Sequence, residues 1–195
     1  MITQLKGDRR RNRHAAKTEA ILAAAWELAR EQGLAGISLR ALAARVDLSQ
    51  PSLYSYFASK NQLYDLMFAQ GNRQLLERLE AIELPGDPHD ALKKVSRELV
   101  TFFTEDWARY QIMNQRTVPG FEPSEESYDI ARRVFDWLLA PLHLAGVAAE
   151  AHIDLFVALL AGLSEAQLAN EPTGDRWTRH VELAIDMLLR EVQRS

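Results

Sequence analysis

The chain has 195 residues, of which 47% are hydrophobic and 26% charged, and it contains no cysteine. Its length leaves room for one helical domain and a small appended one, and the lack of cysteine excludes disulfide bonds, thiolate metal sites and cysteine nucleophiles. A cysteine-free chain fits a reducing cytoplasm, where we expect the protein to act. No uninterrupted apolar run approaches the roughly 18 residues of a membrane span, so we expect no membrane partner.

The charge is divided unevenly along the chain. Residues 1–60 carry ten Lys and Arg against five Asp and Glu, a balance of +5, whereas residues 61–195 carry thirteen against twenty-two, a balance of −9. The formal net charge of −4 therefore combines a basic front with an acidic rear. Such a molecule presents its basic end to a polyanion.

Helical spacing of apolar residues, with no alternating runs suited to strands, predicts an all-α chain of about nine helices. The first helix is expected over residues 15–32, with Gly33 just past its end. Residues 1–13 are polar and are expected to be disordered when free. They hold Arg9, Arg10, Arg11 and Arg13, which form either a solvated tail or an arm that enters the minor groove of DNA.

Residues 37–60 hold two short apolar-periodic segments joined by a tight polar corner. The first places Leu39, Leu42, Ala43 and Val46 on one face, and the second does so with Leu53 and Phe57. Each segment follows a serine in the N-cap position, Ser38 for the first and Ser49 for the second. Two short helices with such a corner form a helix-turn-helix, whose second helix, here residues 50–56, fits the DNA major groove.

The same segment resembles the DNA-binding region of the TetR family of bacterial transcriptional regulators. That family has a helix centred on small residues, a corner with glycine, a T/S-L-Y-x-aromatic-F stretch and S-K. The matching residues are Leu42-Ala43, Val46-Asp47-Leu48, Ser52-Leu53-Tyr54-Ser55-Tyr56-Phe57 and Ser59-Lys60. The corner glycine is replaced by Asp47, and aspartate tolerates a left-handed backbone better than most residues do.

The resemblance implies a homodimeric, ligand-responsive repressor that binds a palindromic operator in double-stranded DNA. Glutamine suits a bidentate contact to adenine and arginine one to guanine, so the expected base-reading residues are Arg40, Gln50, Pro51 and Ser52. The residues expected to bind phosphates, which fix the register without reading sequence, are Ser38, Tyr54, Tyr56 and Lys60.

A linking helix is expected over residues 60–83, capped by Ser59 and stopped by the turn at residues 85–88. Further helices are expected over residues 88–106, 125–144, 148–170 and 175–193, with Pro141 as a kink in the second of these and a short helix or turn over residues 107–115. The chain therefore divides into a DNA-binding domain, residues 1–60, and a ligand-binding and dimerisation domain, residues 84–195.

Large aromatic and sulfur-bearing side chains are concentrated in the rear domain. A plain core explains any single one of them, but as a group they suit a cavity for an apolar or aromatic small molecule. The resemblance implies an effector pocket in this region. Its expected lining is Phe102, Phe103, Trp107, Tyr110, Met113, Phe121, Tyr128, Phe135 and Phe156.

The last two helices combine small residues with leucine stripes, which either pack on their own domain or permit close helix approach between copies. The resemblance implies a four-helix dimer interface. Its expected residues are Leu155, Ala158, Leu159, Gly162, Leu163, Ala166, Val181, Ile185 and Leu188.

The sequence offers no residues for an enzyme mechanism, metal site or cofactor. It has no H-E-x-x-H, no phosphate-binding glycine loop, and no strand before Gly162-Leu163-Ser164 that would make a nucleophile elbow. Two alternatives stay open on the residues alone. One is a helical small-molecule-binding or enzymatic bundle whose front motif docks a protein, and the other is a regulator without a small-molecule effector.

Overall fold

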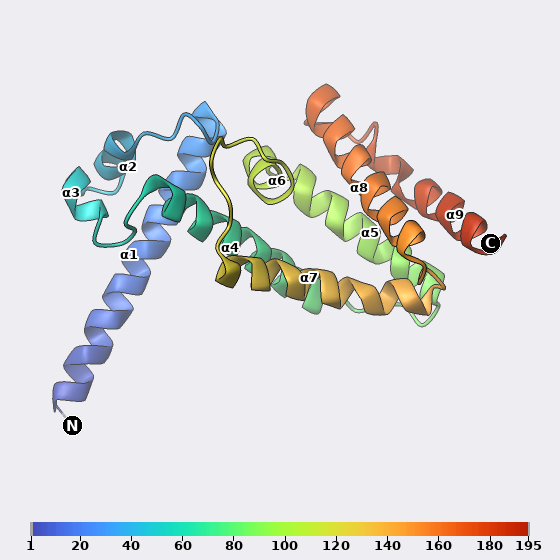
Figure 1. The fold of residues 1–195 in the computed structure, drawn as a ribbon, viewed down its shortest axis with the longest axis horizontal. Coiled ribbons are helices and arrows are strands. Elements are labelled where there is room, and N and C mark those ends of the chain that lie inside the picture. Colours follow the sequence, from blue (N-terminus) through green and yellow to red (C-terminus); the bar gives the residue numbers. More distant parts are fainter. Residues whose placement is uncertain (1, 195) are drawn as a thin grey trace.

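The computed structural model describes residues 2–194, with side chains from Arg11 onward, and over that range it holds nine α-helices and one 3₁₀ helix (Figure 1). The all-α prediction is confirmed. The elements are α1 (Ile2–Gln32), α2 (Leu39–Arg45), α3 (Gln50–Leu53), α4 (Lys60–Glu80), α5 (Pro88–Thr104), α6 (Trp107–Asn114), α7 (Glu125–Leu144), α8 (Glu150–Asn170), η1 (Thr178–His180) and α9 (Val181–Val192).

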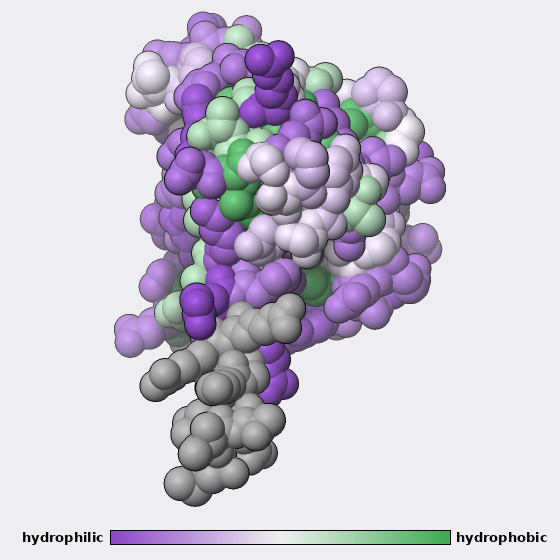
Figure 2. Space-filling model, turned by 90° about the vertical axis from the view of Figure 1, so that its left-hand side faces the viewer, coloured by the Kyte–Doolittle hydropathy of each residue, from purple (hydrophilic) through white to green (hydrophobic). Residues whose placement is uncertain are grey.

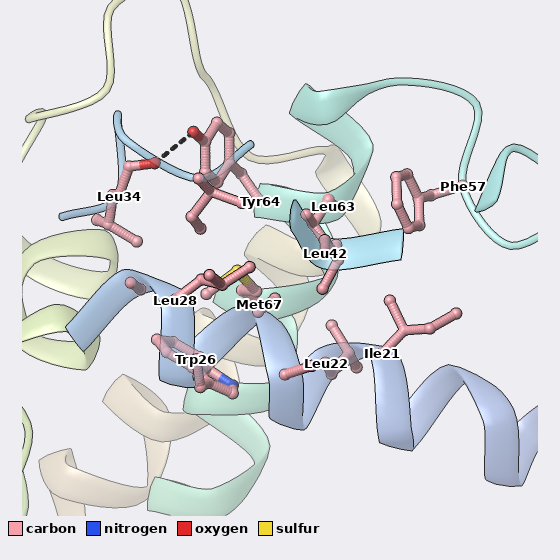
Figure 3. Close-up of a cluster of buried hydrophobic side chains, with 14 of the residues drawn as sticks. Ile21, Leu22, Trp26, Leu28, Leu34, Leu42, Phe57, Leu63, Tyr64 and Met67 are labelled. Carbon is pink, nitrogen blue, oxygen red and sulfur yellow. Dashed lines mark hydrogen bonds between the residues drawn. The ribbon is translucent and has the colours of Figure 1, made fainter. Parts of the chain in front are cut away.

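The front core is formed by α1, α2, α3 and the first half of α4. Of the residues that the apolar spacing turns inward, five are buried here, Leu42, Ala43, Val46, Leu53 and Phe57, and Leu39 is half-buried. Figure 3 shows Leu42 and Phe57 within this core. Tyr64 of α4 lies among them and donates its hydroxyl to the Leu34 carbonyl at 2.6 Å, and burial raises its pKa to about 12. The core fixes the two short helices against α1 and α4, so the helix-turn-helix has a firm base.

The rear core is formed by the second half of α4 with α5, α7, α8 and α9. Its buried residues include Leu75 and Leu79 of α4, whereas Leu63 and Met67 of the same helix belong to the front core. α4 therefore spans both cores, and it lies along α7 for much of its length (Figure 1). A change in the rear core that moves α4 would therefore also move the part of α4 that packs in the front core.

Two ionic contacts reinforce the packing between helices, one between α1 and α6 and one within the rear, between α4 and the end of α5. Arg30 of α1 donates from Nε to the Asp106 carboxylate at 2.9 Å, and Asp106 also caps α6 by accepting from the backbone N–H groups of Ala108 and Arg109. Arg78 of α4 pairs with Glu105 at the end of α5 at 2.6 Å, which lowers the pKa of Glu105. These contacts supplement the apolar packing along α4.

Local signals in the sequence position most helix starts correctly. Ser38, Ser49 and Ser59 each accept a hydrogen bond from the backbone N–H three residues later, at 3.4, 3.3 and 3.1 Å. Asp47 has φ 53°, the left-handed conformation that the replaced corner glycine predicts. The corner therefore keeps its geometry without glycine.

Replacing Asp47 with isoleucine is expected to lower the free energy of unfolding by about 1–2 kcal/mol, because a branched side chain at positive φ crowds the following carbonyl. Replacement with glycine should change it by less than about 1 kcal/mol, because easier backbone geometry is offset by greater freedom in the unfolded chain. Urea unfolding of both variants measures this. Equal losses in the two would show that the aspartate side chain matters more than the backbone.

The start of the first helix differs from the prediction. α1 begins at Ile2, so residues 2–13, expected to be disordered, continue the helix and extend away from the rest of the molecule (Figure 1). The segment contains no proline, and apart from Gly7 it offers little to interrupt a helix that the packed part of α1 has already nucleated.

The second helix of the motif is shorter than predicted. α3 ends at Leu53, and residues 54–56 form turns instead of the expected helix to residue 56. The backbone N–H groups of Tyr54, Ser55 and Tyr56 donate to carbonyls three residues back, and the Ser55 hydroxyl also donates to the Ser52 carbonyl at 2.7 Å. Serine side chains that bond the local backbone compete with a regular α-helix.

Candidate functional site

The first turn of α3 carries three exposed residues, Gln50, Pro51 and Ser52. The Ser49 and Ser52 hydroxyls lie 2.7 Å apart, and the Ser52 backbone N–H donates to the Ser49 hydroxyl. Gln50 projects beside this capped turn. The residues expected to read bases therefore share one exposed surface at the start of a helix, the end that a helix-turn-helix directs at base edges.

Two arginines on α2 differ in their surroundings. Arg45 donates two hydrogen bonds of 2.9 Å to the Glu31 carboxylate of α1, and this contact lowers the pKa of Glu31. Arg40 is exposed, and no ion pair holds it within the described part of the chain. Arg40 is therefore available to an anion or a base edge, whereas Arg45 fastens α2 to α1.

The residues expected to bind phosphate are positioned in different ways. Tyr54 is 48% exposed and points out of the motif, but the Ser38 hydroxyl is already occupied as the N-cap of α2. Lys60 donates from Nζ to the Ala35 carbonyl at 3.0 Å, and partial burial lowers its pKa. Lys60 therefore has a structural contact that the sequence does not indicate.

Helix α1 fastens the corner of the motif. The His14 ring stacks on Tyr56, with centroids 4.7 Å apart, and its Nε2 lies 3.3 Å from the Ser55 carbonyl. Lys17 donates to the Val46 carbonyl at the end of α2, at 2.6 Å. Sequence reasoning missed both residues, because neither belongs to the motif and only the packing of α1 brings them to it.

The basic residues of the expected arm lie on the projecting part of α1. Arg11 and Arg13 are exposed, while the side chains of Arg9 and Arg10 lie outside those that the structure describes. The face of the molecule that carries α1, α2 and α3 is mostly hydrophilic (Figure 2). A hydrophilic face with excess positive charge suits a polyanion.

The rear of the molecule contains an apolar cavity of about 240 Å³ between α4, α5, α6, α7 and α8. Five predicted pocket residues line it: Phe103, Tyr110, Met113, Phe135 and Phe156. No charged side chain lines it, and its polar groups are the amides of Asn72 and Asn114 and the hydroxyl of Tyr110. This lining suits an apolar molecule with few hydrogen-bonding groups.

The remaining predicted pocket residues lie elsewhere. Phe121 and Tyr128 line a second cavity, of about 390 Å³, beneath the α6–α7 loop, and Trp107 borders a third, of about 330 Å³, between α6 and α8. Phe102 lines none of these three cavities. It is 2% exposed and packs under the Arg109 guanidinium, whose Cζ lies 3.7 Å from the ring centroid.

The outward face of α8 is apolar. Leu155 is 48% exposed, Ala158 and Gly162 are exposed, and Leu159, Leu163 and Ala166 are half-buried at the edges of this face. The predicted interface residues of α8 therefore share one surface. Among residues 2–194, α8 is also the one helix long and apolar enough to cross a membrane by length and composition alone, a test that core helices pass too.

The prediction of interface residues on α9 is wrong. Val181, Ile185 and Leu188 are 1%, 0% and 4% exposed, because they face the rear core of their own chain. The exposed apolar residues of α9 are Leu183 and Met187, at 53% and 57%. The helical period could have identified these two residues from the sequence, because Leu183 and Met187 lie on the face opposite the buried stripe of α9.

Comparison with known proteins gives a family-model match to the front of the chain and several structures of similar fold. Residues 21–67 match the family model for bacterial regulatory proteins of the tetR family, and no curated protein matches the chain. In fold, the chain is similar to the TetR family transcriptional regulator PfmR from Thermus thermophilus, at 22% identity and a TM-score of 0.63 over 87% of this chain and 97% of that one.

Two further structures of similar fold hold ligands. A TetR variant from Acinetobacter baumannii AYE, in complex with minocycline, is 25% identical, with a TM-score of 0.58 over 89% of this chain and 94% of that one. AibR, in complex with isovaleryl coenzyme A and operator DNA, is 18% identical, with a TM-score of 0.62 over 88% and 96%.

Proposed function

We propose that this chain, which carries the DNA-binding domain of the TetR family of bacterial transcriptional regulators in a TetR-like fold, is a ligand-responsive repressor. It binds a palindromic operator as a homodimer and acts in the cytoplasm. The observation that carries the proposal is the exposed first turn of α3 within the matched segment, with Gln50 beside the capped Ser49–Ser52 turn.

The proposed base contacts follow from the chemistry of the exposed side chains. Gln50 matches the donor and acceptor of an adenine edge, and Arg40 matches the two acceptors of guanine. Pro51 and Ser52 contact neighbouring bases or thymine methyl groups. Tyr54 binds a phosphate, and Tyr56 and Lys60 lie close enough to contribute while they hold the motif together.

The proposed dimer uses the outward face of α8 with Leu183 and Met187 of α9. Exposed apolar side chains of this size on two adjacent helices are unusual on a surface that stays in water. A second copy related by two-fold symmetry covers the same patch on both subunits. The two α3 helices then meet half-sites roughly 34–36 Å apart, about one turn of DNA.

The proposed effector site is the apolar cavity, and its connection to DNA is α4. Asn72 and Leu75 of α4 line the cavity, and the same helix begins at Lys60 and packs Leu63 into the front core. A ligand that favours a shifted α4 alters the separation of the two α3 helices, and binding to fixed half-sites weakens. The ligand-bound neighbours support an effector of some kind, without naming this one.

The test is competition binding with an operator selected from random duplexes. Gln50→Ala is expected to weaken binding to it by roughly 1–3 kcal/mol and to relax the preference at one base pair, because a bidentate contact carries sequence information. Tyr54→Phe is the matched control: it loses a phosphate contact and should weaken selected and random duplexes by equal factors.

If Gln50→Ala weakened binding to both duplexes equally, the proposal that α3 reads bases would be wrong. A wild-type protein that shows no salt-dependent shift on any duplex would favour the alternative in which the front motif docks a protein.

A further inference from the structure

Two of the cavities lie side by side. Met113 and Asn114, at the end of α6, line both the apolar cavity and the larger one beneath the α6–α7 loop. The apolar cavity, at about 240 Å³, is smaller than the roughly 300–1,000 Å³ usual for ligand sites, whereas the larger one, at about 390 Å³, falls inside that range. Their shared wall is the end of one short helix.

The two cavities differ in chemistry. The apolar one is lined without charged side chains, but the other is bordered by Gln115, Arg116, Glu122 and Glu125. The Glu125 carboxylate accepts a hydrogen bond of 2.8 Å from Arg132, while no ion pair is described for Arg116. The larger cavity therefore offers hydrogen-bonding and charged groups next to an apolar compartment.

The Met113 side chain lies between the two cavities. Its side chain packs against both the front and the rear core, and its Sδ would lie 2.7 Å from a Cβ placed on Gly71 of α4. Glycine at position 71 leaves the methionine room, and an unbranched thioether with three rotatable bonds changes conformation at little cost. A rotation of this one side chain would join the cavities.

We infer that the two cavities are the ends of one site for a small amphipathic molecule. Its apolar body fills the cavity lined by Phe103 and Phe156, and its polar head passes Met113 into the cavity bordered by Arg116. The inference rests on the proposed effector function and names the chemical class of the effector. The larger cavity also has apolar side chains in its wall, among them Phe68 and Phe121, but of the two it is the smaller one that is free of charged side chains.

The loop over the polar end of this site is fastened to the part of α4 nearest the DNA-binding motif. Asn61 donates to the Gly120 carbonyl of the α6–α7 loop at 3.1 Å, and the Asp65 carboxylate accepts from the backbone and hydroxyl of Ser124 at 2.7 and 2.8 Å. A head group that displaces this loop therefore acts on the first two turns of α4 through these hydrogen bonds, and the cavity itself touches α4 at Phe68. A molecule that fills only the apolar cavity touches α4 farther along, at Asn72 and Leu75.

The inference is tested by calorimetry with two probes that share one apolar body, butylbenzene and 4-phenyl-1-butanol. In a joined site the alcohol binds at least as tightly as the hydrocarbon, because its hydroxyl reaches polar partners. In an isolated apolar cavity the amides of Asn72 and Asn114 and the Tyr110 hydroxyl already donate to backbone carbonyls, so the alcohol hydroxyl is buried with few partners and the alcohol binds about tenfold or more weakly.

Variants of Met113 sharpen the comparison. Met113→Phe replaces a flexible side chain with a stiff one. It is expected to lower the affinity for the alcohol about tenfold and the affinity for the hydrocarbon by less than about threefold. Met113→Ala removes the side chain between the cavities without adding bulk, so it should raise the affinity for the alcohol more than the affinity for the hydrocarbon. Leu84→Phe is the control on the exposed loop between α4 and α5, outside both cavities and the proposed interface, and should leave both affinities unchanged.

The outcomes separate the inference from the proposed function. Tight binding of the hydrocarbon with weak binding of the alcohol, or equal responses of the two probes to both Met113 variants, overturns the joined site and keeps the apolar effector cavity. Binding of neither probe overturns both. Tighter binding of the alcohol, lost selectively in Met113→Phe, supports the joined site.

Discussion

Replacing Leu155 and Met187 together with aspartate is expected to give a folded monomer that has lost tight operator binding. Both side chains are about half exposed in the single chain, so the change costs the fold little. In the proposed dimer they lie in the interface of both copies, and four buried carboxylates oppose association. Sedimentation velocity measures the assembly, and circular dichroism measures the fold.

The loss in operator affinity should be large, because a dimer binds its second half-site at a high effective concentration that a monomer lacks. The expected decrease is about 10²–10⁴-fold. The informative control is Leu188→Asp, one residue along the same helix but 4% exposed, which should unfold the rear domain. A dimer that survives the Leu155 and Met187 changes would locate the interface elsewhere.

Replacing Asp106 with alanine is expected to lower the free energy of unfolding by about 2 kcal/mol. The carboxylate is 9% exposed, caps α6 through two backbone N–H groups and receives a hydrogen bond from Arg30. Loss of a cap costs about 1 kcal/mol. Loss of the ion pair adds a similar amount, less than for a fully buried pair because Arg30 is half exposed.

Asp106→Asn separates the two contributions, because asparagine caps a helix well but carries no charge. It should lose about half as much stability as the alanine variant in urea unfolding. If the two variants lose equally, the cap contributes little and the contact between α1 and α6 dominates. If the asparagine variant loses nothing, the ion pair contributes little.

Short-range chemistry explains which predictions were confirmed. The serine caps before α2, α3 and α4, the buried face of the motif and the left-handed backbone at Asp47 all depend on residues within a few positions of one another. These signals made the front of the molecule predictable from the sequence, and the match of residues 21–67 to a family model lies in the same part.

Contacts between distant segments decided the rest. Phe102 was predicted to line a pocket, but Arg109 of the next helix lies over its ring. Val181, Ile185 and Leu188 were predicted at an interface, but they fill the core opposite α5. In each case the sequence shows that a side chain is apolar and does not show which of two apolar environments it enters.

The sequence by itself determined that this chain is all-helical, that its front is basic and that residues 37–60 form a helix-turn-helix, because helical period, charge and capping are local properties. Only the tertiary structure decided that α4 is shared by two cores, that His14 and Lys17 hold the corner of the motif, and that Met113 separates an apolar cavity from a polar one. The physical reason is that burial and cavity shape depend on how helices pack, and residues far apart in the chain, such as Gly71 and Met113, set that packing together.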